Sequence, residues 1–268
     1  MRASNNMITL LAAFRLIGFF ALSIIAMGLQ SLMLIFRASA SRWVPHIYFI
    51  CVAKLLSMRV RIEGPKPLDR AGLILANHAS WLDIVVLSSA LPVIFVAKKE
   101  VASWPFFGAL AKLGGTIFLD RQKRQNTAVA CNHMQERMSR GHQVVLFPEG
   151  TTSDGNRVLP FRSALLGAAN GNLAENAVVP ALITYWGRYG LPMSRSKRSL
   201  YAWFGEMTLP QHLWGIAKNG PFDVILRFYP PIDLSAGRKI ACHHAETLLS
   251  QELARTLNGQ YSVAHLQK

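Results

Sequence analysis

Residues 77–83 combine a histidine and an aspartate at a spacing that suits proton transfer. They read Asn77-His78-Ala79-Ser80-Trp81-Leu82-Asp83 and directly follow the apolar run Leu73–Ala76. A neutral imidazole can take a proton from a bound hydroxyl, and a carboxylate on its other ring nitrogen fixes the tautomer. The chain contains no Gly-x-Ser-x-Gly nucleophile elbow. The pair His78 and Asp83 therefore favours direct attack by a bound alcohol over formation of an acyl-enzyme.

The same spacing has a purely structural interpretation. Ser80 and Asp83 fit the start of a helix as a capping pair, which would make His78 an ordinary loop residue. With 8 His and 14 Asp+Glu in 268 residues, chance alone supplies about 0.4 pairs at this spacing. Both interpretations stay open when this segment is taken by itself.

Two later segments also place polar residues behind apolar runs. The first contains Gly115, Phe118 and Arg121, and the second contains Glu149, Gly150 and Thr151. Taken singly, each reads as the end of a strand, with a solvated arginine in one case and a Pro-Glu-Gly turn in the other. If the strands are parallel, however, all three segments meet at the same edge of the sheet, where such folds bind their ligands.

The pattern of apolar runs predicts an α/β domain with a mixed, largely parallel sheet flanked by helices. The predicted strands are Leu73–Ala76, Val93–Ala97, Thr116–Leu119, Val144–Phe147, Val178–Tyr185 and Val224–Phe228. The predicted helices are Ser80–Ala90, Lys98–Leu113, Asn126–Arg140, Arg162–Leu173 and a closing helix, Ile240–Leu257. We expect irregular structure at 187–199 and at 213–221. The basic run 195–198 reads as a solvated loop, and the alternative is that, beside a membrane anchor, it attracts anionic lipid headgroups.

The N-terminal region predicts a membrane anchor over residues 1–61, ahead of a catalytic domain over 62–268. Leu16–Phe36 carries no charge, and as a helix it would rise about 31 Å, close to the thickness of a bilayer core. Ile47–Met58 is too short to cross and suits an interfacial helix, or a re-entrant one. A cleaved signal peptide and a buried core helix are the alternatives for the two segments. Basic residues concentrate after the first segment, which predicts a domain on the cytoplasmic side of the inner membrane.

Composition narrows the partners. The net charge of +15 comes from 29 Lys+Arg against 14 Asp+Glu, and it suits an anionic membrane or an acidic carrier protein. The basic residues are scattered, with no nucleic-acid-binding signature, so we expect no nucleic acid partner. The three cysteines have neither metal-ligand nor redox spacing. We expect no metal and no cofactor.

Together the segments resemble the motifs of the lysophospholipid acyltransferase family, which includes the 1-acylglycerol-3-phosphate acyltransferases. The resemblance runs from about residue 72 to residue 185. It implies that His78 is the base and Asp83 its orienting acid. It further implies that Gly115, Phe118 and Arg121 form the motif that holds an acceptor phosphate, that Glu149, Gly150 and Thr151 bind the acceptor, and that Pro180 belongs to a strand associated with the acyl chain.

The resemblance implies transfer of a fatty acyl group from acyl carrier protein or coenzyme A to a lysolipid hydroxyl. The expected acceptor is 1-acyl-sn-glycerol-3-phosphate, giving phosphatidic acid. Thr152 stands where phosphatidate-forming members often carry arginine, and residues 153–161 and 203–207 are similar to bacterial lyso-ornithine lipid acyltransferases. Lyso-ornithine lipid is therefore the alternative acceptor. A membrane-bound thioesterase and a non-catalytic lipid-binding protein are alternatives of other classes.

Overall fold

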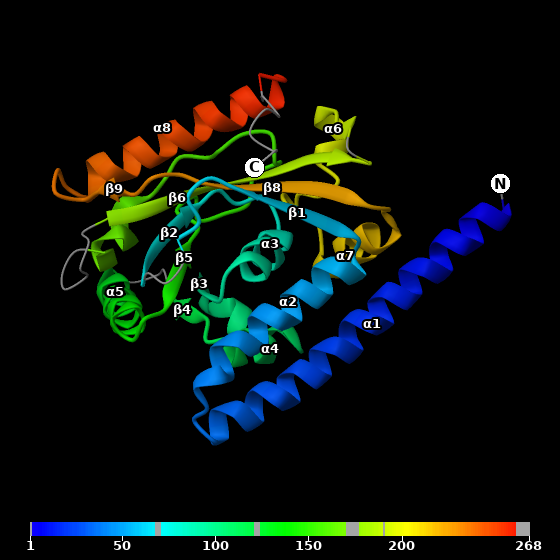
Figure 1. Ribbon diagram of the computed structural model, residues 1–268, viewed down its shortest axis with the longest axis horizontal. Helices are drawn as coiled ribbons and strands as arrows, with labels where there is room; N and C mark the ends of the chain where they lie inside the picture. Colours follow the sequence, from blue (N-terminus) through cyan, green and yellow to red (C-terminus); the bar gives the residue numbers. More distant parts are fainter. Residues whose placement is uncertain (1, 68–70, 121–123, 170–176, 190, 261–268) are drawn as a thin grey trace.

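The computed structural model describes the whole chain except residues 1, 68–70, 121–123, 170–176, 190 and 261–268 (Figure 1). Its centre is a sheet of nine strands. Seven of them follow the order β1-β8-β6-β2-β5-β3-β4, and the other two, β7 and β9, each pair with β6. The strands are β1 Met58–Glu63, β2 Gly72–Ala76, β3 Val93–Lys98, β4 Ile117–Leu119, β5 Gln143–Leu146, β6 Ala177–Arg188, β7 Leu191–Pro192, β8 Phe222–Phe228 and β9 Ile232–Asp233.

The sheet is mixed and largely parallel, which confirms the predicted fold class. Strands β6, β2, β5, β3 and β4 run parallel to one another, whereas β8 is antiparallel to β6 and parallel to β1. Strands buried on both faces read as continuous apolar runs, which is why β2 and β5 were visible in the sequence. The carboxyl ends of β2, β5 and β4 lie at one edge of the sheet, and His78, Glu149 and Arg121 follow these ends in the sequence.

Helices cover both faces of the sheet. They are α1 Arg2–Ile35, α2 Trp43–Leu55, α3 Leu82–Ala90, α4 Phe107–Leu113, α5 Arg124–Ser139, α6 Arg195–Arg198, α7 Leu209–Lys218 and α8 Arg238–Leu257, with 3-10 turns η1 Ser39–Arg42, η2 Lys99–Ser103 and η3 Ser163–Ala169. One apolar core joins the sheet to α1, α2, α3 and α7, and a second joins its other face to α5, η3 and α8. Alternate strand residues supply the two cores, so a register slip would exchange them.

Three predicted elements are wrong. The helix predicted over Lys98–Leu113 is split into η2 and α4, because Pro105 has no N–H to donate and restricts the residue before it. The helix predicted over Arg162–Leu173 is the short 3-10 turn η3 where it falls on described residues. Conversely, the region 213–221, predicted to be irregular, lies largely in α7, with a proline in its first turn.

The N-terminal region differs from the prediction because it contains a strand. The predicted interfacial helix corresponds to α2, which ends at Leu55. The next residues form β1, which pairs in register with β8 and was not predicted. Its alternation of arginines with apolar residues is typical of a strand at the sheet edge. The predicted boundary between residues 61 and 62 falls inside this strand, so anchor and catalytic domain share the sheet.

Helix α1 packs one face against the rest of the protein and leaves the other face apolar and open. Its residues Asn6–Ile35 are long and apolar enough to cross a membrane, by length and composition. The buried positions are Ala12, Arg15, Phe19, Ser23 and Gln30, spaced as one helical face. The outward face carries large exposed apolar side chains from Met7 to Ile35. Such a surface is energetically unfavourable in water and suits lipid.

Polar side chains fasten the inward face of α1 at three levels. Arg15 donates through Nη1 to the carbonyl oxygens of Ala217 and Asn219, at 2.9 and 2.6 Å, and through Nη2 to the Ser57 hydroxyl. The hydroxyls of Ser23 and Tyr48 lie 2.7 Å apart. These contacts join α1 to the carboxyl end of α7 and to α2.

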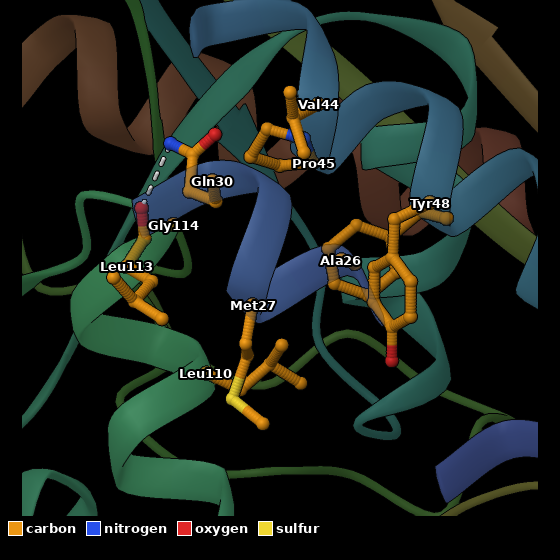
Figure 2. A pocket seen from close by; sticks show the side chains of 10 residues that line it. Ala26, Met27, Gln30, Val44, Pro45, Tyr48, Leu110, Leu113 and Gly114 are labelled. Carbon is orange, nitrogen blue, oxygen red and sulfur yellow. Dashed lines mark hydrogen bonds between the residues drawn. The ribbon is translucent and has the colours of Figure 1, made fainter. Parts of the chain in front are cut away.

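The third level lies beside a small apolar pocket between α1, α2 and α4. Figure 2 shows the Gln30 amide donating to the Leu113 carbonyl oxygen, 3.1 Å away. Met27, Val44, Tyr48 and Leu110 are among the side chains that line the pocket. Close by, Phe106 and Phe107 pack on Phe20 and Phe19 of α1. These two aromatic side chains therefore take part in docking the N-terminal helix.

Replacing Arg15 should loosen α1. In Arg15→Ala, two carbonyl groups and one hydroxyl lose a charged donor at a site that is only 5% exposed. We expect a loss of about 2–3 kcal/mol in the free energy of unfolding, the usual cost of such a group. Thermal unfolding in detergent micelles measures it. Arg140→Ala is the control, because that arginine makes an exposed pair with Glu136 on α5; equal effects of the two changes would contradict the docking role.

Candidate active site

The His78 loop begins where β2 stops pairing with β6. Beyond Ala76, the Asn77 side chain takes over from the backbone ladder: its amide donates to the Ile183 carbonyl oxygen at 3.0 Å, and its carbonyl oxygen accepts from the Ile183 N–H at 2.7 Å. The chain can therefore leave the sheet without leaving a buried backbone pair of β6 unsatisfied. His78 follows at once and projects from the edge of the sheet.

The structure brings His78 and Asp83 together. Nδ1 of His78 lies 2.8 Å from Oδ2 of Asp83. The same oxygen accepts the backbone N–H groups of Ala79 and Ser80, at 2.7 and 2.9 Å. The other carboxylate oxygen accepts the Tyr185 hydroxyl at 2.6 Å. A carboxylate surrounded by donors can only accept, so Nδ1 carries the proton and Nε2 is left as the basic nitrogen.

Burial and stacking hold this pair in place. Asp83 is fully buried, whereas the His78 side chain keeps 20% of its surface exposed. The imidazole stacks on the Phe147 ring at 4.0 Å between centroids and 14° between planes. Burial, followed by the charge of Asp83, holds the pKa of Tyr185 well above its usual value, so its hydroxyl remains a donor at neutral pH. His78 can therefore present one nitrogen to a substrate while the other is fixed.

The capping interpretation is also partly correct. Asp83 accepts the Ser80 N–H, which is half of a capping box. The Ser80 hydroxyl, in contrast, does not cap the helix, because α3 begins after Trp81 without a side-chain cap. One carboxylate thus starts α3 and orients His78, so the structural and chemical interpretations describe the same contact.

Glu149 braces the loop from the neighbouring strand. Its Oε1 accepts the backbone N–H of His78 at 2.9 Å, and four residues on, the Ser153 N–H donates to the His78 carbonyl oxygen at 2.8 Å. Gly150 turns the chain between them with a φ of 72°, a conformation that glycine adopts without strain. Glu149 is almost fully buried, whereas Thr151 is exposed. Glu149 is therefore placed to position His78.

The other described residues of the predicted site lie on β4, on β6 and in the turn before β4. Gly115 has a φ of 77° in the turn before β4, and Phe118 lies on β4 opposite Ala97. Pro180 is buried on β6 in register with Leu75 of β2. Arg121 lies outside the described residues. Its predicted contact with an acceptor phosphate therefore stays a prediction.

A second layer of contacts comes from residues 198–203, which the sequence placed partly in a solvated loop. Arg198 is buried and donates to the carbonyl oxygens of Tyr185 and Met193 and to the Asn156 side chain. The prediction of a solvated run at 195–198 is therefore wrong for Arg198. The Trp203 N–H donates to the Ala79 carbonyl oxygen at 2.7 Å. Thr152, at the position of the expected arginine, donates its hydroxyl to the Trp203 carbonyl oxygen.

Sequence reasoning missed Tyr185 as a member of the site. It was counted within an apolar strand, more than a hundred residues after Asp83. A signal was present, since a tyrosine in a strand buried on both faces needs a partner for its hydroxyl. Nothing in the sequence indicated that this partner is Asp83.

Comparison with known proteins places the chain among acyltransferases. The Acyltransferase family model matches residues 58–184. A lyso-ornithine lipid O-acyltransferase from Rhizobium meliloti is 38% identical over 88% of this chain and 82% of its own length. A 1-acyl-sn-glycerol-3-phosphate acyltransferase from Neisseria meningitidis is 36% identical over 62% of each chain. The crystal structure of the 1-acyl-sn-glycerophosphate (LPA) acyltransferase PlsC from Thermotoga maritima has the same fold, with a TM-score of 0.64 and 21% identity over 97% of this chain and 99% of that chain.

The matching family model and relatives define the class of this protein as an acyltransferase. The chain belongs to the acyltransferase family, which confirms the resemblance seen in the motifs.

Removing the Tyr185 hydroxyl should slow the reaction without removing the site. In Tyr185→Phe, Asp83 loses one of its four donors and orients His78 less firmly. Because the loss of positioning outweighs the gain in basicity, we expect kcat to fall roughly tenfold, about 1.4 kcal/mol, with KM little changed. The acidic limb of the pH–rate profile should move to higher pH, because a carboxylate with fewer donors stabilises the imidazolium more strongly. Steady-state acyl transfer across pH measures both effects.

Tyr201→Phe is the matched control, since Tyr201 is equally buried and stacks on Tyr185 at 6.1 Å. A pH profile that moves equally in both variants would show that packing, and not the hydrogen bond to Asp83, accounts for the change.

Glu149 should make stability depend on pH. Burial raises its pKa to about 8, and the Asp83 charge adds to the rise, although backbone hydrogen bonds from His78 and Leu159 oppose it. A raised carboxyl pKa means that the folded state binds a proton the unfolded chain has lost. The contribution of Glu149 to the free energy of unfolding is therefore complete below about pH 4.5. It is lost as pH rises towards 8, with a slope of at most about 1.4 kcal/mol per pH unit.

Thermal unfolding of wild type and Glu149→Gln across this pH range tests the point. Glutamine keeps an acceptor for the His78 N–H but does not ionise. The stability of Glu149→Gln should therefore change less between pH 5 and 8, the range over which the raised pKa of Glu149 acts. Parallel curves would contradict the assignment.

Proposed function

We propose that this enzyme transfers a fatty acyl group from a thioester to the hydroxyl of a lysolipid. Nε2 of His78 takes the hydroxyl proton as the oxygen attacks the thioester carbonyl, and Asp83 stabilises the imidazolium that forms. The tetrahedral intermediate then expels the thiolate, which recovers the proton from His78. The observation that carries this mechanism is the 2.8 Å contact from Nδ1 to a carboxylate held by three other donors.

We propose lyso-ornithine lipid as the preferred acceptor. The relatives with that name match more of the chain than the 1-acyl-sn-glycerol-3-phosphate acyltransferases do. In addition, Thr152 supplies no cation and its hydroxyl is committed to Trp203. A phosphate dianion would thus lack one charged donor.

1-Acyl-sn-glycerol-3-phosphate, the acceptor expected from the motifs, is the second candidate. Gly115, Phe118 and Arg121 support it, because that motif in the resembling family holds a phosphate. Glu149, Gly150 and Thr151 complete the acceptor-binding set that the resemblance implies.

The net charge of the chain supports a proposal for the acyl donor, and helix α1 supports a proposal for the location of the enzyme. We propose acyl carrier protein or coenzyme A thioester as donor, with no resident cofactor, since both donors are anionic and the chain carries a net charge of +15. We further propose that α1 anchors the enzyme in the inner membrane, with the catalytic domain on the cytoplasmic side. Because one face of α1 packs on the catalytic domain, the lipid meets its outward face. The acceptor can then be taken from the bilayer directly.

Parallel assays with two acceptors test the proposal. A labelled acyl thioester would be offered with lyso-ornithine lipid or with lysophosphatidic acid in micelles, to wild type and to His78→Ala. We expect ester product mainly from lyso-ornithine lipid, and a loss of at least about 10³-fold in the variant, in which the general base is missing.

Circular dichroism and membrane association of His78→Ala provide the control for folding. Substantial transfer by the variant would rule out the mechanism. Faster product formation from lysophosphatidic acid would reassign the acceptor and keep the chemistry. Thioester hydrolysis that is equally fast without any acceptor would instead indicate a thioesterase.

A further inference from the structure

One exposed surface beside the active site has no role in the chemistry described so far. It consists of the tip of the β6–β7 hairpin and the adjoining helix α6. We call it the basic rim and define it by Arg188, Tyr189, Leu191, Arg195, Lys197 and Leu200. Tyr189, Leu191 and Leu200 are 66%, 70% and 57% exposed, and the three cations are exposed as well. Residues 188–200 contain no acidic residue.

The tip keeps an aromatic side chain outside the protein. Tyr189 has a φ of 56°, which is unusual for a bulky residue. The Arg188 guanidinium lies over its ring, 5.3 Å from the centroid. Large apolar groups that remain exposed beside cations are typical of surfaces that meet lipid headgroups, where tyrosine and basic residues are enriched.

The basic rim lies next to the part of α1 that projects from the protein. A methyl group on Gly220 would come within 2.7 Å of Arg188 Nη2 and 3.0 Å of the Tyr189 hydroxyl, so the tip touches Gly220. The preceding residue, Asn219, accepts a hydrogen bond from Arg15 of α1. The N-terminal part of α1 extends past the body of the protein, on the side where α6 and α7 lie (Figure 1). Large exposed apolar side chains before Arg15 include Met7, Leu10 and Phe14.

The basic rim also adjoins the active-site loop. Asn156 accepts from buried Arg198 at the end of α6 and donates to the Arg195 carbonyl oxygen. A few residues after the rim, Trp203 binds the Ala79 carbonyl oxygen beside His78. The surface therefore connects the projecting part of α1 with the mouth of the site.

We propose that the basic rim is a second membrane contact, separate from α1, and that it binds the surface of an anionic bilayer. Arg188, Arg195 and Lys197 would contact lipid phosphates, while Tyr189, Leu191 and Leu200 enter the headgroup layer. An acidic carrier protein would satisfy the cations, but it would leave three large apolar side chains without a comparable partner. The inference rests on the proposed function in one respect: the acceptor of the reaction lies in the same bilayer.

An environment-sensitive fluorophore tests this contact without measuring catalysis. The full chain, with Cys51, Cys131 and Cys242 replaced by alanine, would carry a single Leu191→Cys labelled with a nitrobenzoxadiazole dye. It would be reconstituted in phosphatidylcholine vesicles with and without phosphatidylglycerol. We expect a blue shift of emission and quenching by lipids with nitroxide-labelled headgroups, both stronger with phosphatidylglycerol. Asn132→Cys, an exposed position on α5, is the matched control and should remain unquenched.

Charge reversal separates attraction to anionic lipid from general insertion. Arg188→Glu with Arg195→Glu and Lys197→Glu should remove the effect of phosphatidylglycerol on the dye at position 191. Arg140→Glu with Lys239→Glu and Arg255→Glu, just after α5 and on α8, should leave it intact. Equal emission and quenching at positions 191 and 132 would overturn the proposal. Shielding of the dye by added acyl carrier protein, without lipid quenching, would also overturn it and assign the rim to the carrier.

Limited proteolysis of the unsubstituted chain gives a second measurement. Trypsin cleavage after Arg195 and Lys197 should be slower in phosphatidylglycerol vesicles than in micelles, relative to cleavage after Lys239; equal ratios would count against the proposal. Acyl transfer is followed in the same vesicles. An active enzyme with a water-exposed rim contradicts this inference alone, and an inactive enzyme with a lipid-quenched rim contradicts the proposed function alone.

Discussion

The carboxylate of Asp83 is the interaction on which the site depends. An ionised carboxylate that is fully buried is strongly destabilising unless its oxygens are satisfied. Here four donors satisfy it: the imidazole of His78, the N–H groups of Ala79 and Ser80, and the hydroxyl of Tyr185. These groups come from a loop, the start of a helix and a strand far along the chain. The contacts that orient His78 are thus the same contacts that allow Asp83 to be buried.

The sheet supplies the rigidity that this arrangement needs. Strand β6 runs on beyond the end of β2, so its later residues face the loop that β2 releases. Asn77 binds Ile183 in place of the ladder, and Tyr185, two residues further on, points to Asp83. From the other neighbour of β2, Glu149 holds the His78 N–H. The loop is therefore fixed from both adjacent strands, which is the precision that positioning a general base requires.

The sequence predicted the framework better than the contacts. Parallel strands and the polar segments at their ends were visible, because burial on both faces produces continuous apolar runs and a site must follow them. Local patterns could not show where a chain of helical composition breaks, as at Pro105. Nor could they show that Arg198 is buried by its bonds to the Tyr185 and Met193 carbonyl oxygens and to the Asn156 side chain. Tyr185 was hidden for the same reason. Its partner is chosen by strand register, which depends on the whole sheet.

Contacts between residues far apart in the sequence also hold α1 on the catalytic domain. Arg15, Ser23 and Gln30 lie within the long, mostly apolar stretch of α1, and in a lipid-facing helix these side chains would be unfavourable. All three face inward and bind the catalytic domain, through Ala217 and Asn219, through Tyr48 and through Leu113. Arg15, Ser23 and Gln30 therefore define the orientation of α1 on the domain, and the large apolar side chains of α1 form its exposed face. An unrelated hydrophobic helix would lack these polar contacts, and it would not fix the orientation of the catalytic domain relative to α1.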